Sequence, residues 1–216
     1  MYSLDLQLFR WLNSWAFWGS WTDALIVFRA IFLGWWMLAG LSAFGLFTLP
    51  PLAAVFPSFR PFRRRNWEMI GVALVAAGAA RFGIAELIRF FYDRARPFEV
   101  LSGVHQLIFR DGGGSFPSGH ATFYFAVAAV VSRYYPKTSI LFFLAALNLS
   151  LARVQAGVHW PSDILGGLII GIAIGLLMHW VAQKYLKPKY GPRSFLNHPQ
   201  ISGTASGTRW RWGVHS

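Results

Sequence analysis

The run PSDILGGLIIGIAIGLLMHWVA, at residues 161–182, decides the class of the fold. Asp163 is its one charged side chain, and the run reaches the ~20 apolar residues that a membrane-spanning helix needs. Pro161 suits the first position of a helix, where its missing N–H costs no hydrogen bond. The glycines along the run are Gly166, Gly167, Gly171 and Gly175. The sequence therefore predicts a transmembrane helix that begins at Pro161.

Four other apolar runs precede this one and are separated by prolines and charged loops. They occupy residues 23–49, 67–90, 118–135 and 138–151. The 216-residue chain is 55% hydrophobic and 13% charged, about half the charged fraction of a soluble domain. We expect an all-α, polytopic membrane helix bundle with about five transmembrane helices, in one domain at residues 1–186. Residues 187–216 form a basic tail that we expect to be disordered.

Residues 3–18 are too polar to span a membrane, yet their apolar side chains recur at helical spacing. The apolar positions are Leu4, Leu8, Trp11, Leu12 and Trp15, against Asp5, Gln7, Arg10 and Asn13. This pattern predicts an amphipathic helix in the membrane interface, with its tryptophans at headgroup depth. A helix packed on the bundle is an equally good interpretation, and neither interpretation assigns the segment a chemical role.

The formal charge of +12 does not indicate nucleic-acid binding, because the basic residues lie in loops between apolar runs. The loops at residues 60–65 and 133–137 and the tail share one side and carry basic residues without acidic partners. By the positive-inside rule that side is the cytoplasm, and the polar segments at residues 89–120 and 153–163 face outward. The chain has no cysteine, which excludes disulfides and thiolate metal sites.

Three polar clusters stand at the ends of the apolar runs. The first is RFFYDRARP at residues 89–97. Arg89 and Arg96 are seven residues apart, about two helical turns, and two guanidiniums directed at one point suit a phosphate dianion. Interfacial arginines that extend their charge to water would give the same pattern.

The second cluster is PSGH at residues 117–120, at the start of an apolar run. Ser118 is a natural N-cap, and Gly119 leaves room for a ligand beside the first backbone N–H groups of a helix. Such an N-terminus is an anion site. An ordinary cap followed by an interfacial His120 is the alternative.

The third cluster comprises Arg153, His159 and Asp163. A carboxylate in the first turn of a helix can accept the proton of one imidazole nitrogen and leave the other nitrogen free to attack. Arg153, at the end of the preceding run, can add a cation to the same pocket. A structural His–Asp hydrogen bond explains this cluster equally well in isolation.

Together and in this order, the three clusters resemble the signature of the type 2 phosphatidic acid phosphatase superfamily of membrane lipid phosphatases. That signature reads Lys-x6-Arg-Pro, then Pro-Ser-Gly-His, then Ser-Arg-x5-His-x3-Asp. Two positions depart from it, because Arg89 replaces the Lys and Ala152 replaces the Ser. Arg89 keeps the charge of the Lys but changes its geometry from a point to a fork. We expect the loss of the Ser at Ala152 to weaken phosphate binding modestly and to leave the mechanism intact.

The resemblance implies a role for each site residue. His159 would attack phosphorus and form a phosphohistidine, Asp163 would orient it, and His120 would protonate the leaving oxygen and then activate water. The residues implied to bind the phosphate are Arg89, Arg96, Ser118, Gly119 and Arg153. The resemblance implies no metal and no cofactor. Arg81 and Glu86, charged residues within an apolar run, could pair with one another or with these groups.

Within the superfamily the chain is most similar to bacterial undecaprenyl-diphosphate phosphatases. The similarity lies in the segment LDLQLFRWLN at residues 4–13, in Arg96-Pro97-Phe98 and in SFP at residues 115–117. It implies a polyprenyl diphosphate substrate, reached at the outer face of the inner (cytoplasmic) membrane. The alternatives are a phosphatidylglycerophosphate or broad-specificity phosphatidate phosphatase and, more remotely, a non-catalytic lipid-binding or transport relative. The sequence does not indicate an oligomeric state.

Overall fold

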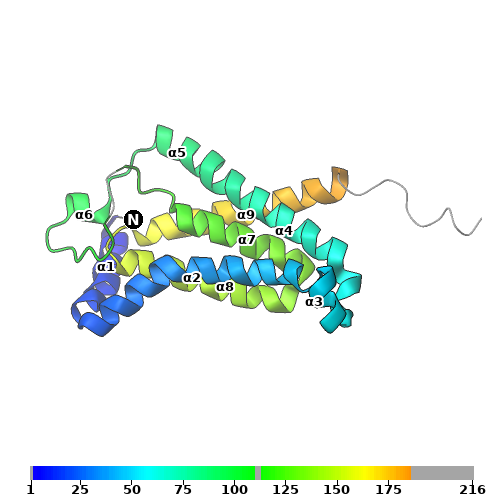
Figure 1. Cartoon of the computed structure of the whole chain (residues 1–216). Helices are drawn as coiled ribbons and strands as arrows, with labels where there is room; N and C mark the ends of the chain where they lie inside the picture. Colours follow the sequence, from blue (N-terminus) through cyan, green and yellow to red (C-terminus); the bar gives the residue numbers. More distant parts are fainter. Residues whose placement is uncertain (1, 110–112, 186–216) are drawn as a thin grey trace, which may run out of the picture.

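The computed structural model of the protein describes residues 2–109 and 113–185, and within these ranges it contains helices and no β-strand (Figure 1). The elements are α1 (Tyr2–Asn13), η1 (Ser14–Phe17), α2 (Ser20–Leu46), α3 (Pro50–Val55), η2 (Pro57–Phe62), α4 (Arg63–Gly78), η3 (Ala79–Ile84), α5 (Ala85–Phe91), α6 (Pro97–Val100), α7 (Gly119–Tyr134), α8 (Pro136–Gln155) and α9 (Pro161–Tyr185). The predicted all-α class is confirmed. The predicted tail at residues 187–216 lies outside the described residues.

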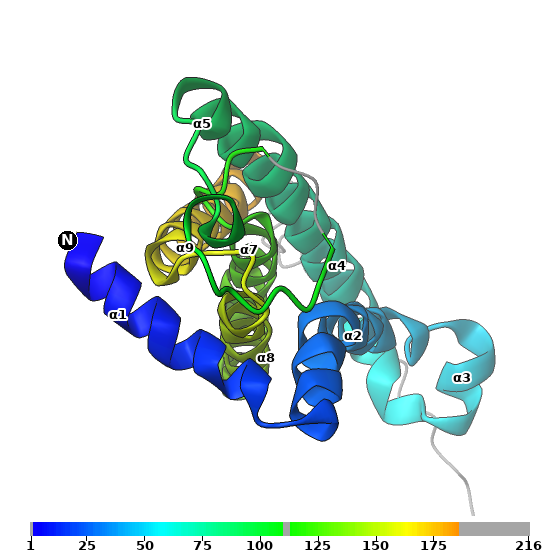
Figure 2. The same ribbon diagram turned by 90° about the vertical axis from the view of Figure 1, so that its left-hand side faces the viewer.

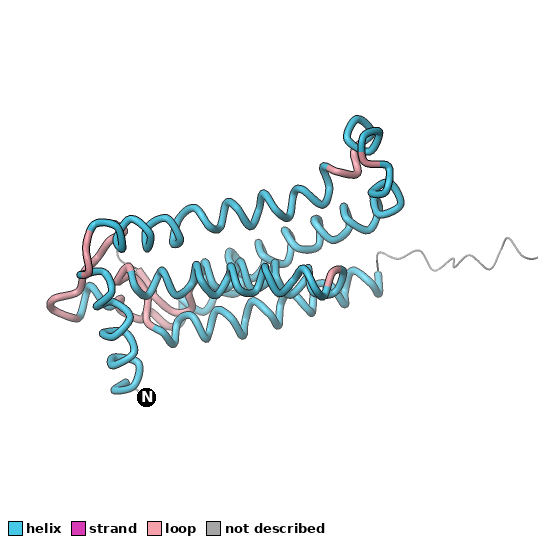
Figure 3. The backbone as a smooth tube through the Cα atoms, turned by 90° about the horizontal axis from the view of Figure 1, so that it is seen from below, coloured by secondary structure: helices cyan, strands magenta, loops and turns pink. Residues whose placement is uncertain are grey.

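Within the described residues, the five long helical units are α2, the continuous helix Arg63–Phe91, α7, α8 and α9. They run side by side and form the bundle (Figures 1 and 3). Four of them are long and apolar enough to cross a membrane, namely α2, the continuous helix Arg63–Phe91, α8 and α9. The fifth, α7, has 16 residues and is about 24 Å long at the helical rise of 1.5 Å per residue. The five predicted runs therefore correspond to these five units, with boundaries that differ by a few residues.

Helix α7 forms the centre of the bundle and packs most extensively against α9. The backbones of α7 and α9 approach closely because α9 has glycines at the contact. A Cβ added at Gly167 would lie 2.8 Å from the backbone oxygen of Ser118, and one added at Gly171 would lie 2.5 Å from that of Thr122. Small residues at a backbone contact are typical of helix association in membranes. This packing holds the start of α7 against the start of α9.

The helix from Arg63 to Phe91 is continuous but changes its winding in the middle, where α4 passes into the π-helical segment η3 and then into α5. Such π-helical turns frequently occur at functional sites. Here the turn carries Arg81. A Cβ added at Gly119 would lie 2.2 Å from Arg81 Nε, so the guanidinium of Arg81 lies directly over the start of α7.

The two ends of the bundle differ in composition. One end, at the left of Figure 1, holds the end of α5, α6, the starts of α7 and α9, and the end of α8. The opposite end holds α3, η2 and the arginines that open α4, which are Arg63, Arg64 and Arg65. The three predicted clusters therefore share one end, away from the arginine-rich loop, as the alternation of spans predicts.

Helix α1 crosses the first of these ends and does not run along the bundle (Figures 1 and 2). Its Phe9 is 1% exposed, and the Phe9 ring centroid lies 5.3 Å from that of Trp160. On the other face of the helix Leu4, Leu8 and Trp11 are exposed. Helix α1 thus combines features of both predicted interpretations, since it packs on the bundle and turns an apolar face outward.

Candidate active site

Arg96 is the most deeply buried cation of the predicted set, with 1% of its surface exposed at the start of α6. Its guanidinium donates from Nε to Gly113 O (3.0 Å), from Nη2 to Gly114 O (3.2 Å) and from Nη1 to Val158 O (2.8 Å). These bonds tie the loop before α7 to the segment before α9. They also fix the plane of the guanidinium, whose Nη1 lies 3.5 Å from Nε2 of His159.

His159 and Asp163 are both buried; His159 lies two residues before α9, and Asp163 lies in its first turn. Nδ1 of His159 lies 3.4 Å from Asp163 Oδ2, and the same oxygen accepts the backbone N–H of Trp160 at 2.8 Å. The imidazole therefore stands between a carboxylate at Nδ1 and the Arg96 guanidinium at Nε2. This is the His–Asp pairing that the sequence predicts.

The start of α7 lies beside this pair, because the N–H of Ser118 donates to the backbone oxygen of Asp163 at 3.0 Å. Ser118 occupies the N-cap position, as predicted. The expected capping bond is not made, since the Ser118 side chain bonds none of the helix N–H groups. The structure therefore has Ser118 at the N-cap position without the side-chain bond that usually accompanies it.

The Ser118 hydroxyl is fully buried and has no hydrogen-bond partner among the described residues. A buried hydroxyl in this condition costs about 1–3 kcal/mol, which a ligand that accepts its hydrogen bond would offset. The first turn of α7 adds backbone N–H groups that the helix cannot satisfy itself, at the positive end of the helix dipole. The residues at the start of α7 therefore form a candidate anion site.

Two arginines from the preceding helix converge on the same place. Arg89 donates from Nη2 to Pro117 O (2.7 Å) and pairs through Nη1 with Glu86 Oε1 (2.7 Å). Glu86 also pairs with Arg81. The two alternatives for Arg81 and Glu86 are thus both realised, since they pair with one another and with Arg89.

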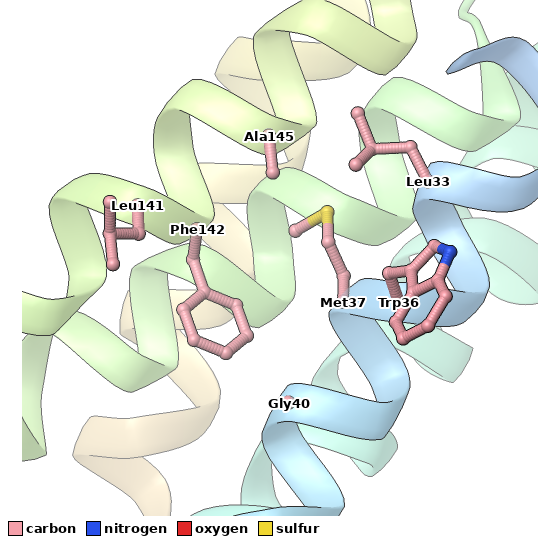
Figure 4. Close-up of a pocket in the computed structure, with 7 residues that line it drawn as sticks. All are labelled: Leu33, Trp36, Met37, Gly40, Leu141, Phe142 and Ala145. Carbon is pink, nitrogen blue, oxygen red and sulfur yellow. The ribbon is translucent and has the colours of Figure 1, made fainter. Parts of the chain in front are cut away.

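His120 lines an opening of about 240 Å³ together with Arg81, Gly119 and Tyr124. The predicted proton donor, His120, therefore shares this opening with the guanidinium of Arg81. A second cavity, of about 190 Å³ between α2 and α8, is shown in Figure 4. Its lining is apolar, with Met37 and Phe142 among the side chains, so it offers no group that could bind phosphate.

Arg153 is buried near the end of α8, where its Nη1 lies 3.5 Å from the backbone oxygen of Ala30 in α2. This contact joins α8 to α2 and does not by itself bring Arg153 to the phosphate site. Ala152, where the resemblance expects a serine, is fully buried beside it. The role of Arg153 in phosphate binding stays a prediction.

Sequence reasoning missed a set of side chains that hold Asp163 from behind. Arg94 donates to Asp163 Oδ1 (2.7 Å) and to Asp5 Oδ2 (2.6 Å), and Ser162 donates to Asp5 as well. Arg94 stands inside the first cluster, and Asp5 lies one turn before the buried Phe9 of α1. Those positions were the only signals available, because nothing in the sequence relates α1 to α9.

Comparison with known proteins gives consistent matches. Residues 67–187 match the PAP2 superfamily. The chain is 24% identical over 181 residues to the bacitracin transport permease protein BcrC of Bacillus licheniformis, which covers 84% of this chain and 82% of that protein. It is 35% identical over 100 residues to the undecaprenyl-diphosphatase BcrC of Bacillus subtilis, covering 46% of this chain and 51% of that protein. The crystal structure of Aquifex aeolicus LpxE is similar with a TM-score of 0.59 and 28% identity, covering 81% of this chain and 94% of that one.

The matched segment contains all three clusters and more than half of the chain. The apolar helices agree with a multi-pass membrane protein. The expectation raised by the motifs is therefore confirmed: this chain belongs to the PAP2 superfamily of membrane lipid phosphatases.

Proposed function

We propose that the protein hydrolyses a polyprenyl diphosphate, undecaprenyl diphosphate, to the monophosphate, with His159 as the nucleophile. The observation that carries this proposal is the setting of the His159 ring. Nδ1 lies 3.4 Å from Asp163 Oδ2, and Nε2 lies 3.5 Å from Arg96 Nη1. A carboxylate at Nδ1 favours the tautomer whose Nε2 lone pair can attack, and the cation beside Nε2 attracts an anionic phosphoryl group.

The reaction would take place in two steps. Nε2 of His159 attacks the terminal phosphorus, the P–O bond to the lipid-borne phosphate breaks, and His120 donates a proton to the leaving oxygen. A water molecule then gives a proton to His120 and attacks the phosphohistidine. The second step breaks the P–N bond, releases inorganic phosphate and restores His159.

Phosphoryl transfer depends mainly on positioning and on stabilisation of the charge on the equatorial oxygens. The residues proposed to hold these oxygens are Arg89, Arg96, Ser118, Gly119 and Arg153. The buried Ser118 hydroxyl and the N–H groups at the start of α7 supply donors, and the arginines supply fixed positive charge. No cofactor takes part in the proposal, so we expect activity to persist in EDTA.

The choice of a diphosphate is supported by Arg81, a cation that lies outside the three motifs. Its guanidinium lies over Gly119 and lines the same opening as His120. A substrate with two phosphates brings more negative charge than a phosphate monoester, and Arg81 could hold the phosphate that leaves with the lipid. The undecaprenyl-diphosphatase of Bacillus subtilis supports the same choice by its similarity to this chain.

We also propose that the site opens at the outer face of the inner (cytoplasmic) membrane. The arginines at the start of α4 lie at the end of the bundle opposite to the clusters. Cytoplasmic loops are the ones enriched in Lys and Arg, so the cluster end would face outward.

The test is phosphate release by the purified protein in detergent, with EDTA present and His159→Ala as the control. Undecaprenyl diphosphate, phosphatidate and phosphatidylglycerophosphate are offered in parallel. We expect release from the diphosphate that persists in EDTA and is absent in the variant.

Other results separate the alternatives. Preference for a glycerolipid would retain the mechanism and replace the substrate by the runner-up class. Equal release by His159→Ala would contradict the histidine nucleophile. The absence of release from all three lipids would favour a non-catalytic lipid-binding or transport relative.

A further inference from the structure

Helix α1 docks on the bundle through side chains spaced four residues apart. Phe9 packs against Trp160, which lies between His159 and the start of α9. Asn13 donates from Nδ2 to Gln155 O at 2.8 Å, at the end of α8. Asp5, one turn before Phe9, lies on the same face of α1 and near the other end of the helix. Because residues at this spacing lie on one helical face, α1 contacts the bundle along that face.

Asp5 completes the N-terminus of α9. Its Oδ1 accepts the backbone N–H of Ser162 at 2.9 Å, and its Oδ2 accepts the Ser162 hydroxyl at 2.6 Å. A carboxylate at this place satisfies an N–H group that the helix leaves unpaired, and it is favoured by the helix dipole. The N-terminal cap of α9 thus comes from a helix about 157 residues earlier in the chain.

Arg94 joins this cap to the buried acid of the candidate site. Its Nη2 donates to Asp5 Oδ2 at 2.6 Å, while its Nη1 donates to Asp163 Oδ1 at 2.7 Å. Partial burial alone would lower the pKa of the Arg94 guanidinium, but its hydrogen bond to Asp5 and the charges of Asp163 and Asp5 raise that pKa above its usual value. Arg94 therefore stays charged over the whole range in which a protein is stable.

The two oxygens of Asp163 have separate partners, and this separation defines the direction of the carboxylate. Oδ1 is held by Arg94, whereas Oδ2 accepts the N–H of Trp160 and faces Nδ1 of His159. Asp163 is fully buried, where a carboxylate is stable only if it is paired and hydrogen-bonded. If Arg94 were lost, the carboxylate would lose the cation that bonds Oδ1, and would keep its hydrogen bonds from the Trp160 N–H and the Ser115 side chain.

We infer that Asp5 and Arg94 are positioning residues for His159, which act through Asp163, so that α1 is a working part of the active site. This inference rests on the proposed function in one respect, namely that His159 is the nucleophile. It assigns a chemical role to the segment for which the sequence indicates none. Asp5 and Arg94 bond Ser162 and Asp163 and are not among the residues proposed to hold the phosphate, so their loss should affect the chemical step more than substrate binding.

The kinetic test compares Asp5→Asn, Arg94→Gln and Arg94→Lys with Arg10→Gln, a control at an exposed position of the same helix. We expect Arg94→Gln to lower kcat by about 100-fold and Asp5→Asn by about 10-fold, as is typical for groups that orient a catalytic residue through another. KM should stay within about threefold, Arg94→Lys should recover part of the loss, and Arg10→Gln should match the wild type. An unchanged kcat, or a loss confined to KM, would overturn the inference.

A second readout needs no substrate. Hydrogen–deuterium exchange of the peptides that cover residues 158–166 should rise in Asp5→Asn and Arg94→Gln and stay unchanged in Arg10→Gln. If exchange there is the same in all variants, α1 does not position His159, and the inference is wrong whatever the activity. If exchange rises but the wild type releases no phosphate, the coupling stands and the proposed function fails.

Discussion

The N-termini of α7 and α9 lie side by side at the same end of the bundle. Among the described residues, side-chain carboxylates bond the N–H groups at the start of α9, whereas the Ser118 side chain makes no such bond at the start of α7. At α9 the carboxylate of Asp5 accepts the first-turn N–H of Ser162, and Asp163 accepts the N–H just before the helix. At α7 the Ser118 side chain makes no capping bond, and its hydroxyl has no partner among the described residues. The carboxylates of Asp5 and Asp163 therefore accept the N–H groups at the start of α9, while, in the part of the chain that the structure describes, the start of α7 keeps the free donors that the proposed phosphate site requires.

The largest effect should come from making α7 resemble α9. In Ser118→Asp a carboxylate would bond the first N–H groups of α7, where it is favoured by the helix dipole. It would occupy the place of the phosphate and repel it. We expect kcat/KM for phosphate release to fall by about 10³-fold, comparable with the loss of a main oxyanion donor.

The same variant should keep its fold if the first N–H groups of α7 bond the new carboxylate, because an unpaired carboxylate at this fully buried position would be costly. We expect the thermal midpoint in detergent to stay the same or to rise. An active Ser118→Asp protein would show that the phosphate binds elsewhere, and the contrast between the two helix starts would have no functional meaning.

A smaller effect is expected from removal of the Ser118 hydroxyl. A hydrogen bond to a charged group contributes about 1.5–3 kcal/mol, so Ser118→Ala should lower kcat/KM by roughly 10- to 100-fold. Stability should not fall, since the buried hydroxyl has no partner among the described residues. Ser132→Ala, on the same helix, removes only a bond to Ala129 O within α7 and should retain wild-type kinetics.

The matched change at α9 should behave in the opposite way. Ser162→Ala removes a bond to Asp5 and one from Arg94, both 2.6 Å long. We expect it to lower the free energy of unfolding by about 1 kcal/mol, seen as a lower thermal midpoint. A stability loss in Ser118→Ala combined with none in Ser162→Ala would contradict the account of the two helix starts.

The smallest effect should come from Arg81, which is partly exposed and lies above the start of α7. Arg81→Gln should lower kcat/KM for the diphosphate by about fivefold, the effect of roughly 1 kcal/mol, and should affect a lipid monophosphate less. Parallel assays on the two substrates measure the difference. An equal loss on both would mean that Arg81 supports the fold of the site and does not recognise a second phosphate.

Much of this arrangement could be predicted from the sequence. The apolar run at residues 161–182 and the four other apolar runs predicted the helix bundle. Polar groups are costly inside a bilayer, so membrane-spanning segments are recognisable from their apolar composition. The pairing of His159 with Asp163 followed from Pro161 as the first helical position, which places His159 just before the helix and Asp163 in its first turn. The N-cap position of Ser118 followed from its place before an apolar run.

The network behind Asp163 could not be predicted in this way. Asp5 and Arg94 meet only because α1 crosses the end of the bundle, and a local pattern contains no information on that docking angle. The conformation of the Ser118 hydroxyl also depends on the packing of α7 against α9. For Arg81 the sequence shows a charge within a span, but the π-helical turn that directs it to Gly119 has no clear sequence signal.

The most direct test of the central claim is covalent trapping of the phosphoryl group. Undecaprenyl diphosphate with a radiolabelled terminal phosphate is mixed with excess protein and quenched in alkali, in which phosphohistidine persists. We predict an alkali-stable, acid-labile label on the peptide that contains His159 in the wild type and no label in His159→Ala. Turnover without any labelled protein, or a label that remains in His159→Ala, would contradict the account.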